Sequence, residues 1–100
     1  MKTAEEINHD EMIPLDFHIS QNYPNPFNIK TMIKYCVGYR SKVEIIVFNA
    51  DDKIVKKLVD EEKNSGTYEV EFFRDELTPG IYYYRMTAGN YSETKTIQVL

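Results

Sequence analysis

The chain has 100 residues, which suits one domain with a modest core, because two cores of half this size would each be too small to stand alone. The net charge is −4 and no more than two basic residues are adjacent, which argues against the basic face that nucleic-acid binding requires. No apolar stretch is long enough to span a membrane, and the acidic N-terminus does not resemble a secretion signal. Eight Tyr and five Phe favour β-structure.

Two parts are expected along the chain. Residues 1–12 are polar, charged and without sustained periodicity, which predicts a flexible linker or tail. Residues 13–100 form the predicted domain. At its start Phe17 and Ile19 alternate with Asp16 and His18, and this period of two indicates a short strand.

An unusual octapeptide follows this strand. It reads Gln21, Asn22, Tyr23, Pro24, Asn25, Pro26, Phe27 and Asn28. Each proline removes a backbone donor and extends the residue before it, so this octapeptide should be an irregular lead-in outside the middle of a sheet. We expect the amides of Asn22, Asn25 and Asn28 to bond neighbouring backbone, and Phe27 and Tyr23 to pack onto the domain.

Six further strand-like runs follow, separated by turn signals. They cover residues 31–37, 42–49, 53–59, 67–73, 81–88 and 91–99. The second of these is apolar on both faces, which predicts a central strand covered, at least in part, on both sides. Turns are expected at residues 49–52, 60–66 and 75–80, and Gly89-Asn90 is a hairpin signal.

Residues 54–63 also allow a helical interpretation, because Ile54, Val55, Leu58 and Val59 fall at helix-like spacing. A β-branched run between two turn signals favours a strand instead. The pattern as a whole predicts an all-β fold, an immunoglobulin-like antiparallel β-sandwich of about seven strands.

Reactive residues are few and scattered. His9 and His18 have no evident partner for a metal or a catalytic site, and Cys36 is interpreted as an inert thiol on the less buried face of its strand. A single cysteine excludes an internal disulfide, but fits both a reducing compartment and an extracytoplasmic domain without cross-links. The acidic residues at 51–52 and 60–62 lack the glycine pattern of a calcium loop and are interpreted as solvated turn charge. We expect no cofactor and no metal.

Several segments together resemble the type A C-terminal sorting domain of the type IX secretion system. The octapeptide QNYPNPFN is the first, and others match in register. They are TMIKY at 31–35, KVEIIVFN at 42–49, VKKLVDEEKNSG at 55–66, LTPGIYYYRMTAG at 77–89 and ETK at 93–95. The resemblance covers residues 13–100. Asp52 stands where the family often has a turn glycine, and Lys95 is the only Lys of the last fifteen residues, where the family usually has a basic tail.

This resemblance implies a β-sandwich related to the immunoglobulin-like domain of the flagellar hook-capping protein, located at the C-terminus of exported cargo. It implies passage from the periplasm across the outer membrane through an export machinery, then release or attachment at the cell surface by a sortase-like enzyme. The chain itself is expected to be a domain excised from a longer protein that has an N-terminal cargo domain.

The residues expected to act in sorting lie near the C-terminus, because an edge strand offers unpaired donors and acceptors to a partner. They are Gly89, Glu93, Thr94, Lys95, Ile97, Val99 and Leu100. The octapeptide, with Gly80, Tyr82 and Tyr84, is expected to be mainly structural.

The leading functional hypothesis is thus a non-catalytic sorting module. The alternative is an adhesive or carbohydrate-binding accessory module, because at least one of the consecutive Tyr82, Tyr83 and Tyr84 must face outward. A structural assembly domain is a third possibility. An enzyme would require a nucleophile and a base within hydrogen-bond reach.

Overall fold

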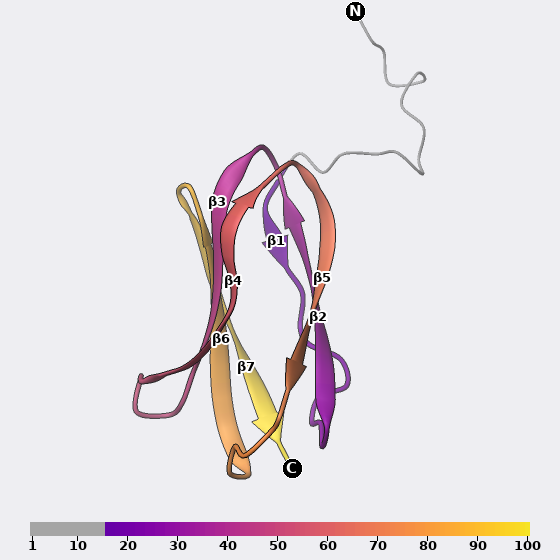
Figure 1. Cartoon of the computed structure of the whole chain (residues 1–100), viewed down its shortest axis with the longest axis vertical. Helices are drawn as coiled ribbons and strands as arrows, with labels where there is room; N and C mark the ends of the chain where they lie inside the picture. The colour runs from indigo at the N-terminus through magenta and orange to yellow at the C-terminus, as the bar shows by residue number, and fades with distance from the viewer. Residues whose placement is uncertain (1–15) are drawn as a thin grey trace, which may run out of the picture.

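The computed structural model describes residues 16–100, so the predicted tail of residues 1–12 and the first three residues of the predicted domain lie outside the described residues. Within residues 16–100 the chain forms strands and no helix, which confirms the predicted all-β class (Figure 1). The strands are β1 (His18–Ile19), β2 (Lys30–Val37), β3 (Ser41–Phe48), β4 (Ile54–Lys63), β5 (Gly66–Phe73), β6 (Gly80–Ala88) and β7 (Tyr91–Val99). A helix suited to crossing a membrane is not found in this part of the chain.

The strands form two antiparallel sheets that pack face to face (Figure 1). One sheet has the order β1-β2-β5 and the other the order β4-β3-β6-β7. In constant-type immunoglobulin domains the fourth strand pairs with the fifth. Here β4 pairs with β3 instead, so one layer has three strands and the other four, with β4 and β7 at the edges of the larger sheet.

The core fills the space between the two sheets. Alternation along each strand turns every second side chain inward, so apolar residues of β2, β3, β6 and β7 meet there. Its most completely buried members are Ile19, Phe27, Ile33, Tyr35, Val37, Val43, Ile45, Val47, Phe72, Tyr84, Met86, Ile97 and Val99. The sandwich is therefore closed by both of its sheets and by the octapeptide, which contributes Phe27.

Strand β4 explains the helix-like spacing of residues 54–63. Its register against β3 shifts twice, leaving Leu58 and Val55 as extra residues opposite the partner strand. Such β-bulges interrupt the alternation of a strand. As a result Val55, Leu58 and Val59 all pack against the core, at intervals that would otherwise indicate a helix.

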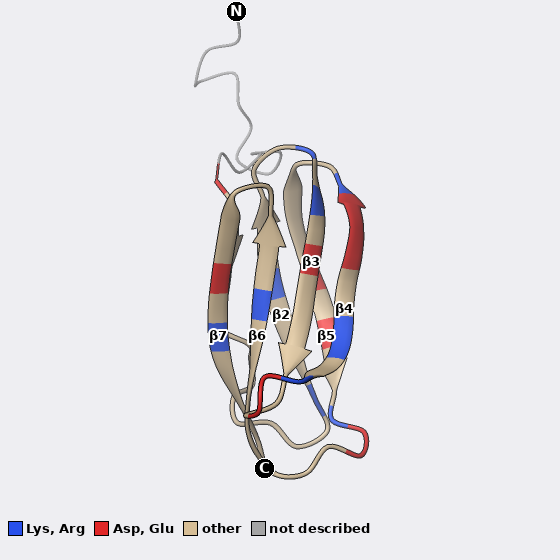
Figure 2. Ribbon diagram, turned by 90° about the vertical axis from the view of Figure 1, so that its left-hand side faces the viewer, with Lys and Arg blue, Asp and Glu red and all other residues tan. Residues whose placement is uncertain are grey.

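The predicted turn at residues 60–66 is wrong in its first half. Strand β4 continues through Lys63, and only Asn64 and Ser65 separate it from β5. Asp60, Glu61 and Glu62 are exposed on this edge strand, where their charge deters pairing with another chain (Figure 2). Composition alone does not distinguish such an edge strand from a polar turn.

Strand β3 is central, as predicted, because it pairs with both β4 and β6. Its outer face, however, is not covered by a further layer within residues 16–100. Phe48 is shielded on that face by the stacked ring of Tyr83, with centroids 5.2 Å apart, and by the guanidinium of Arg85, 4.8 Å from the Phe48 centroid. Two side chains of the neighbouring strand β6 thus cover Phe48 on the outer face.

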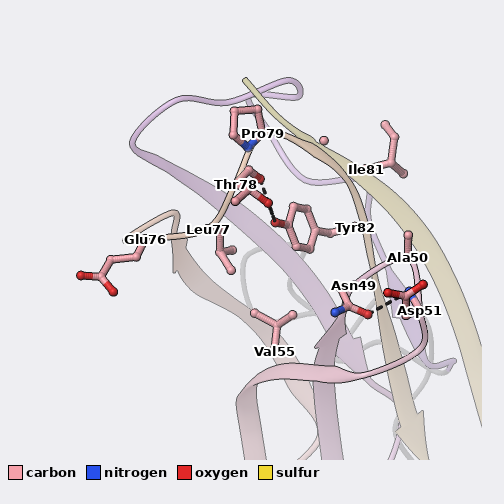
Figure 3. Close-up of a pocket in the computed structure, with 11 residues that line it drawn as sticks. Asn49, Ala50, Asp51, Val55, Glu76, Leu77, Thr78, Pro79, Ile81 and Tyr82 are labelled. Atoms are coloured by element: carbon pink, nitrogen blue, oxygen red, sulfur yellow. Dashed lines mark hydrogen bonds between the residues drawn. The ribbon is translucent and has the colours of Figure 1, made fainter.

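The turn between β5 and β6 is fixed by Tyr82. Its hydroxyl donates a hydrogen bond to the main-chain oxygen of Thr78 at 2.7 Å (Figure 3). A tyrosine near the start of the sixth strand that bonds back to the preceding turn is the tyrosine corner of immunoglobulin-like sandwiches. Gly80, two residues earlier, has φ +145° and open space where a Cβ would lie, so its backbone conformation is what favours glycine there.

Candidate functional site

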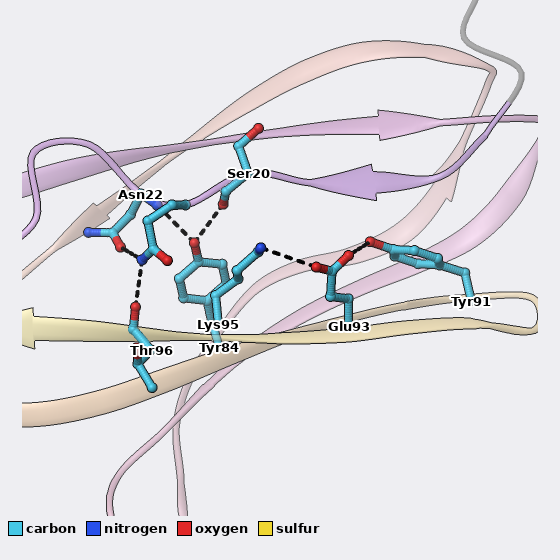
Figure 4. A network of polar contacts seen from close by, with 8 residues as sticks. Ser20, Asn22, Tyr84, Tyr91, Glu93, Lys95 and Thr96 are labelled. Carbon is cyan, nitrogen blue, oxygen red and sulfur yellow. Dashed lines mark hydrogen bonds and ion pairs between the residues drawn. The ribbon is translucent and has the colours of Figure 1, made fainter.

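The octapeptide lies along the free edge of β7, although the two are more than seventy residues apart in sequence (Figure 4). The Gln21 side-chain amide donates to the Thr96 oxygen at 2.6 Å, and the Gln98 N–H donates to Asn25 Oδ1 at 2.9 Å. Phe27 then pairs in parallel with the end of β7, through Phe27 N–H to the Gln98 oxygen at 3.1 Å and Leu100 N–H to the Phe27 oxygen at 3.0 Å. The outward backbone groups of the last residues of β7 are therefore covered by this segment.

Tyr84 holds the start of the octapeptide against the sandwich (Figure 4). Its hydroxyl accepts from Asn22 N–H at 2.8 Å and donates to the Ser20 oxygen at 2.6 Å. The side chain is fully buried, and this burial raises the pKa of Tyr84 to about 12, so the hydroxyl is protonated and able to donate at neutral pH.

The three asparagines of the octapeptide have different partners. Asn22 is buried and its amide donates to the Pro24 oxygen and to Thr31 Oγ1, as the prediction of local backbone bonding requires. Asn25 bonds the backbone of β7, and Asn28 accepts from the Arg74 side chain, so for these two the prediction of neighbouring backbone is wrong. The reason is that the extended, proline-rich backbone turns these side chains towards other segments.

The two aromatic residues of the octapeptide also differ. Phe27 is buried as predicted and packs against Phe72, with ring centroids 5.7 Å apart. Tyr23 is 81% exposed, so the expectation that it packs onto the domain is wrong. Its backbone instead bridges to Met32 of β2, which turns the side chain to solvent.

Strand β7 presents two unlike faces. Ile97 and Val99 are buried in the core, so a partner of the folded domain does not reach their side chains. Thr94, Thr96 and Gln98 are exposed on the opposite face, and Leu100, 56% exposed, follows at the end. We call the exposed residues Gln21, Asn25, Thr94, Thr96, Gln98 and Leu100 the β7 edge surface.

Glu93 and Lys95 are half-buried on the inward side of β7, where they form a short network with Tyr91 (Figure 4). The Tyr91 hydroxyl donates to Glu93 Oε1, and Lys95 Nζ lies 3.1 Å from Glu93 Oε2. Both contacts lower the pKa of Glu93, the Tyr91 hydrogen bond most, whereas burial and the Glu93 carboxylate raise the pKa of Tyr91. The Glu93 carboxylate is therefore already bound by Tyr91 and Lys95 of its own strand.

Comparison with known families bears on this arrangement. The model of the secretion system C-terminal sorting domain matches residues 21–100, from the first residue of the octapeptide to the end of β7 and Leu100. The chain belongs to this family. No curated protein and no solved structure shows significant similarity to it. Membership makes the chain a sorting domain of type IX secretion, which implies export to a secreted or cell-surface fate.

The remaining sequence candidates of this sorting domain lie apart from the β7 edge surface. Gly89 is at the tip of the β6–β7 hairpin with φ +57°, a conformation that glycine adopts without strain. His18 is exposed on β1 opposite Cys36 of β2, and the Cys36 sulfur lies 3.8 Å from Thr67 Oγ1. His9 lies outside the described residues.

The acidic candidates do not converge. Asp60 is paired with Lys42 at 3.3 Å and with Lys57 at 3.7 Å, and the Lys42 contact contributes most to lowering the pKa of Asp60. Asp52 has φ +65°, so it adopts the left-handed turn conformation for which the family often uses glycine. Within residues 16–100 no three His, Cys, Asp or Glu side chains lie close enough together to hold a metal ion.

Tyr83 is the outward-facing member of the three consecutive tyrosines. Its ring stacks on Phe48 with an interplanar angle of 18°, so one face of the ring is already covered. Sequence reasoning placed one tyrosine outward, but missed that Tyr84 joins the octapeptide to β6. The alternation of Tyr82, Tyr83 and Tyr84 predicts which side each occupies, but contains no signal for a partner sixty-two residues away.

Proposed function

We propose that this sorting domain is a non-catalytic module that directs an N-terminal cargo through the outer membrane, and that the β7 edge surface is what the export machinery recognises. The observation that supports this proposal most is the match of the family to residues 21–100, which begins and ends at the two segments that form this surface. Recognition would occur in the periplasm, and a sortase-like enzyme at the cell surface is a further proposed partner.

Three features of β7 suit it to docking. It is an edge strand, and its exposed threonines and glutamine offer hydrogen bonds without a large exposed apolar area. The backbone N–H and C=O groups of Ser92 and Thr94 point away from β6, in the same direction as those of Thr96 and Gln98. Within residues 16–100, these groups of Ser92 and Thr94 form no hydrogen bond. A strand-like segment of a partner therefore has a place to pair.

The test is a reporter fused ahead of residues 13–100 and produced in a host with this pathway. The fusion should reach the surface or the medium, and Thr94→Asp should leave it in the periplasm, because a charge at the open part of the edge opposes docking. Thr67→Asp is the matched control, since Thr67 is an exposed threonine on β5, an edge strand of the other sheet.

The two parts of the proposal fail separately. If the unmodified fusion stays in the periplasm, the export function of this chain is wrong. If the fusion and Thr94→Asp are exported equally well, with both variants folded, the sorting function stands and the recognition role of the β7 edge surface is wrong. Truncation of the whole strand is a poorer test, because removing Ile97 and Val99 would unfold the core.

A further inference from the structure

A groove of about 500 Å³ lies at the end of the sandwich where β6 begins, away from the Ser92–Thr94 part of the β7 edge (Figure 3). It is bounded by the loop of residues 49–53 between β3 and β4 and by the loop of residues 74–79 between β5 and β6. Val55, Leu77 and the ring of Tyr82 give it an apolar base. Ile81, 54% exposed, extends this apolar surface towards the outer face of the sheet.

Both walls of the groove are held by their own hydrogen bonds. Asn49 Oδ1 accepts from the N–H groups of Asp51 at 2.9 Å and Lys53 at 3.0 Å. In the other loop the Tyr82 hydroxyl donates to the Thr78 oxygen. A ligand would therefore not have to order these loops, and preorganisation of this kind reduces the entropic cost of binding.

The charges at the groove are unbalanced. Asp51 and Glu76 flank it on two sides, and neither forms an ion pair or a side-chain hydrogen bond within residues 16–100 (Figure 3). The two loops hold four acidic residues against Lys53 and Arg74. Four acidic against two basic residues leave a net charge of −2, so the rim of the groove favours a positively charged ligand.

We propose that this groove binds an extended peptide segment in which an aliphatic residue stands next to Lys or Arg. The aliphatic side chain would pack against Val55, Leu77 and Tyr82, and the neighbouring cation would lie at the rim near Asp51 or near Glu76, which stand on opposite sides of the groove (Figure 3). The long stem of Lys or Arg suits such a site, because it packs on apolar surface while its charge stays at the rim. This binding site goes beyond the sorting function and does not depend on it.

The probe is a short synthetic peptide of alternating Lys and Leu, titrated into the isotope-labelled domain and followed by amide chemical shifts. Saturable shifts should concentrate in residues 49–53 and 76–81. The combined Asp51→Asn and Glu76→Gln change should weaken binding about fivefold, since each exposed pair is worth about 0.5 kcal/mol, and raising the salt concentration should weaken it further. Glu69→Gln, which removes an exposed acidic charge on β5, should leave binding unchanged.

Other outcomes overturn the proposal. An alternating Lys–Ser peptide that binds equally well would show general charge attraction without use of the apolar base. Shifts spread over the whole surface, or an equal effect of Glu69→Gln, would show the same. Absence of saturable binding by the Lys–Leu peptide to a folded domain would show that the groove is not a peptide site.

Discussion

Tyr83 and Tyr84 are neighbours with opposite environments, and the difference lies in what each hydroxyl does. Tyr84 is buried, and its hydroxyl serves one donor and one acceptor of the main chain at Ser20 and Asn22. Tyr83 lies on the outer face, and its hydroxyl makes no hydrogen bond within residues 16–100. The same chemical change at the two positions therefore isolates the contribution of the Tyr84 bridge.

Tyr84→Phe should lower the free energy of unfolding by about 1–3 kcal/mol, because the buried N–H of Asn22 and the part-buried carbonyl of Ser20 lose their partner while the ring stays in place. Tyr83→Phe should change it by less than about 0.5 kcal/mol. Urea unfolding followed by far-ultraviolet circular dichroism measures both. Equal losses in the two variants would show that the bridge at Ser20 and Asn22 does not stabilise the fold.

The raised tyrosine pKa values predict sensitivity to alkali. In the unfolded chain Tyr84 and Tyr91 lose their protons near pH 10, whereas burial raises the pKa of Tyr84 to about 12 and also raises that of Tyr91. The folded protein then binds more protons than the unfolded chain, so this contribution to stability is complete below pH 10 and is lost as pH rises through about 12. Urea midpoints from pH 8 to pH 12 should fall less steeply in Tyr84→Phe, and parallel curves for the two proteins would contradict the assignment.

At the level of elements, the octapeptide and β7 behave as one unit. Gln21, Asn25 and Phe27 take the outward donors and acceptors from Thr96 to Leu100 that a free edge would leave to solvent or to another chain. Edge strands are places where proteins aggregate, and natural folds cover or charge them. The octapeptide thus covers the edge of β7 from Thr96 to Leu100.

Asn25→Ala should raise the hydrogen-exchange rate of the Gln98 amide by about three- to tenfold, because that N–H loses its side-chain acceptor and a typical hydrogen bond is worth 0.5–1.5 kcal/mol. Asn28→Ala is the control, since Asn28 accepts from the Arg74 side chain and not from β7. Amide exchange measured by NMR on both variants decides it. An unchanged Gln98 rate in Asn25→Ala would mean that the contact does not protect the edge.

The sequence patterns predicted the strands better than they predicted which distant segments contact one another. The runs at residues 31–37 and 42–49 are confirmed as strands β2 and β3, because a strand with one buried face must repeat every two residues. The bulges of β4 broke that rule and produced a helix-like spacing in a strand. The attachment of the octapeptide to β7 had no local signal, since its asparagines are equally suited to a turn and to contacts with a distant strand.

At the scale of the whole molecule, the start of the described chain lies at one end of the sandwich, and Leu100 and the groove lie at the other. The start of the described chain lies beside the first residue of β7, where Phe17 stacks on Tyr91. Leu100 and the groove lie towards the other end (Figure 1, Figure 3). The sandwich thus separates Phe17, at the start of the described chain, from Leu100 at its end.

That separation has a consequence for the proposed docking. From Tyr91 to Val99 the strand has nine residues, which is roughly 30 Å at the usual rise of a strand. Phe17 therefore lies at the same end of the domain as the open Ser92–Thr94 part of the β7 edge, and a full strand length from Leu100. A partner that pairs with this open edge, as proposed, would lie next to the segment that joins the domain to its cargo, whereas a partner bound at Leu100 would be separated from that segment by the length of β7.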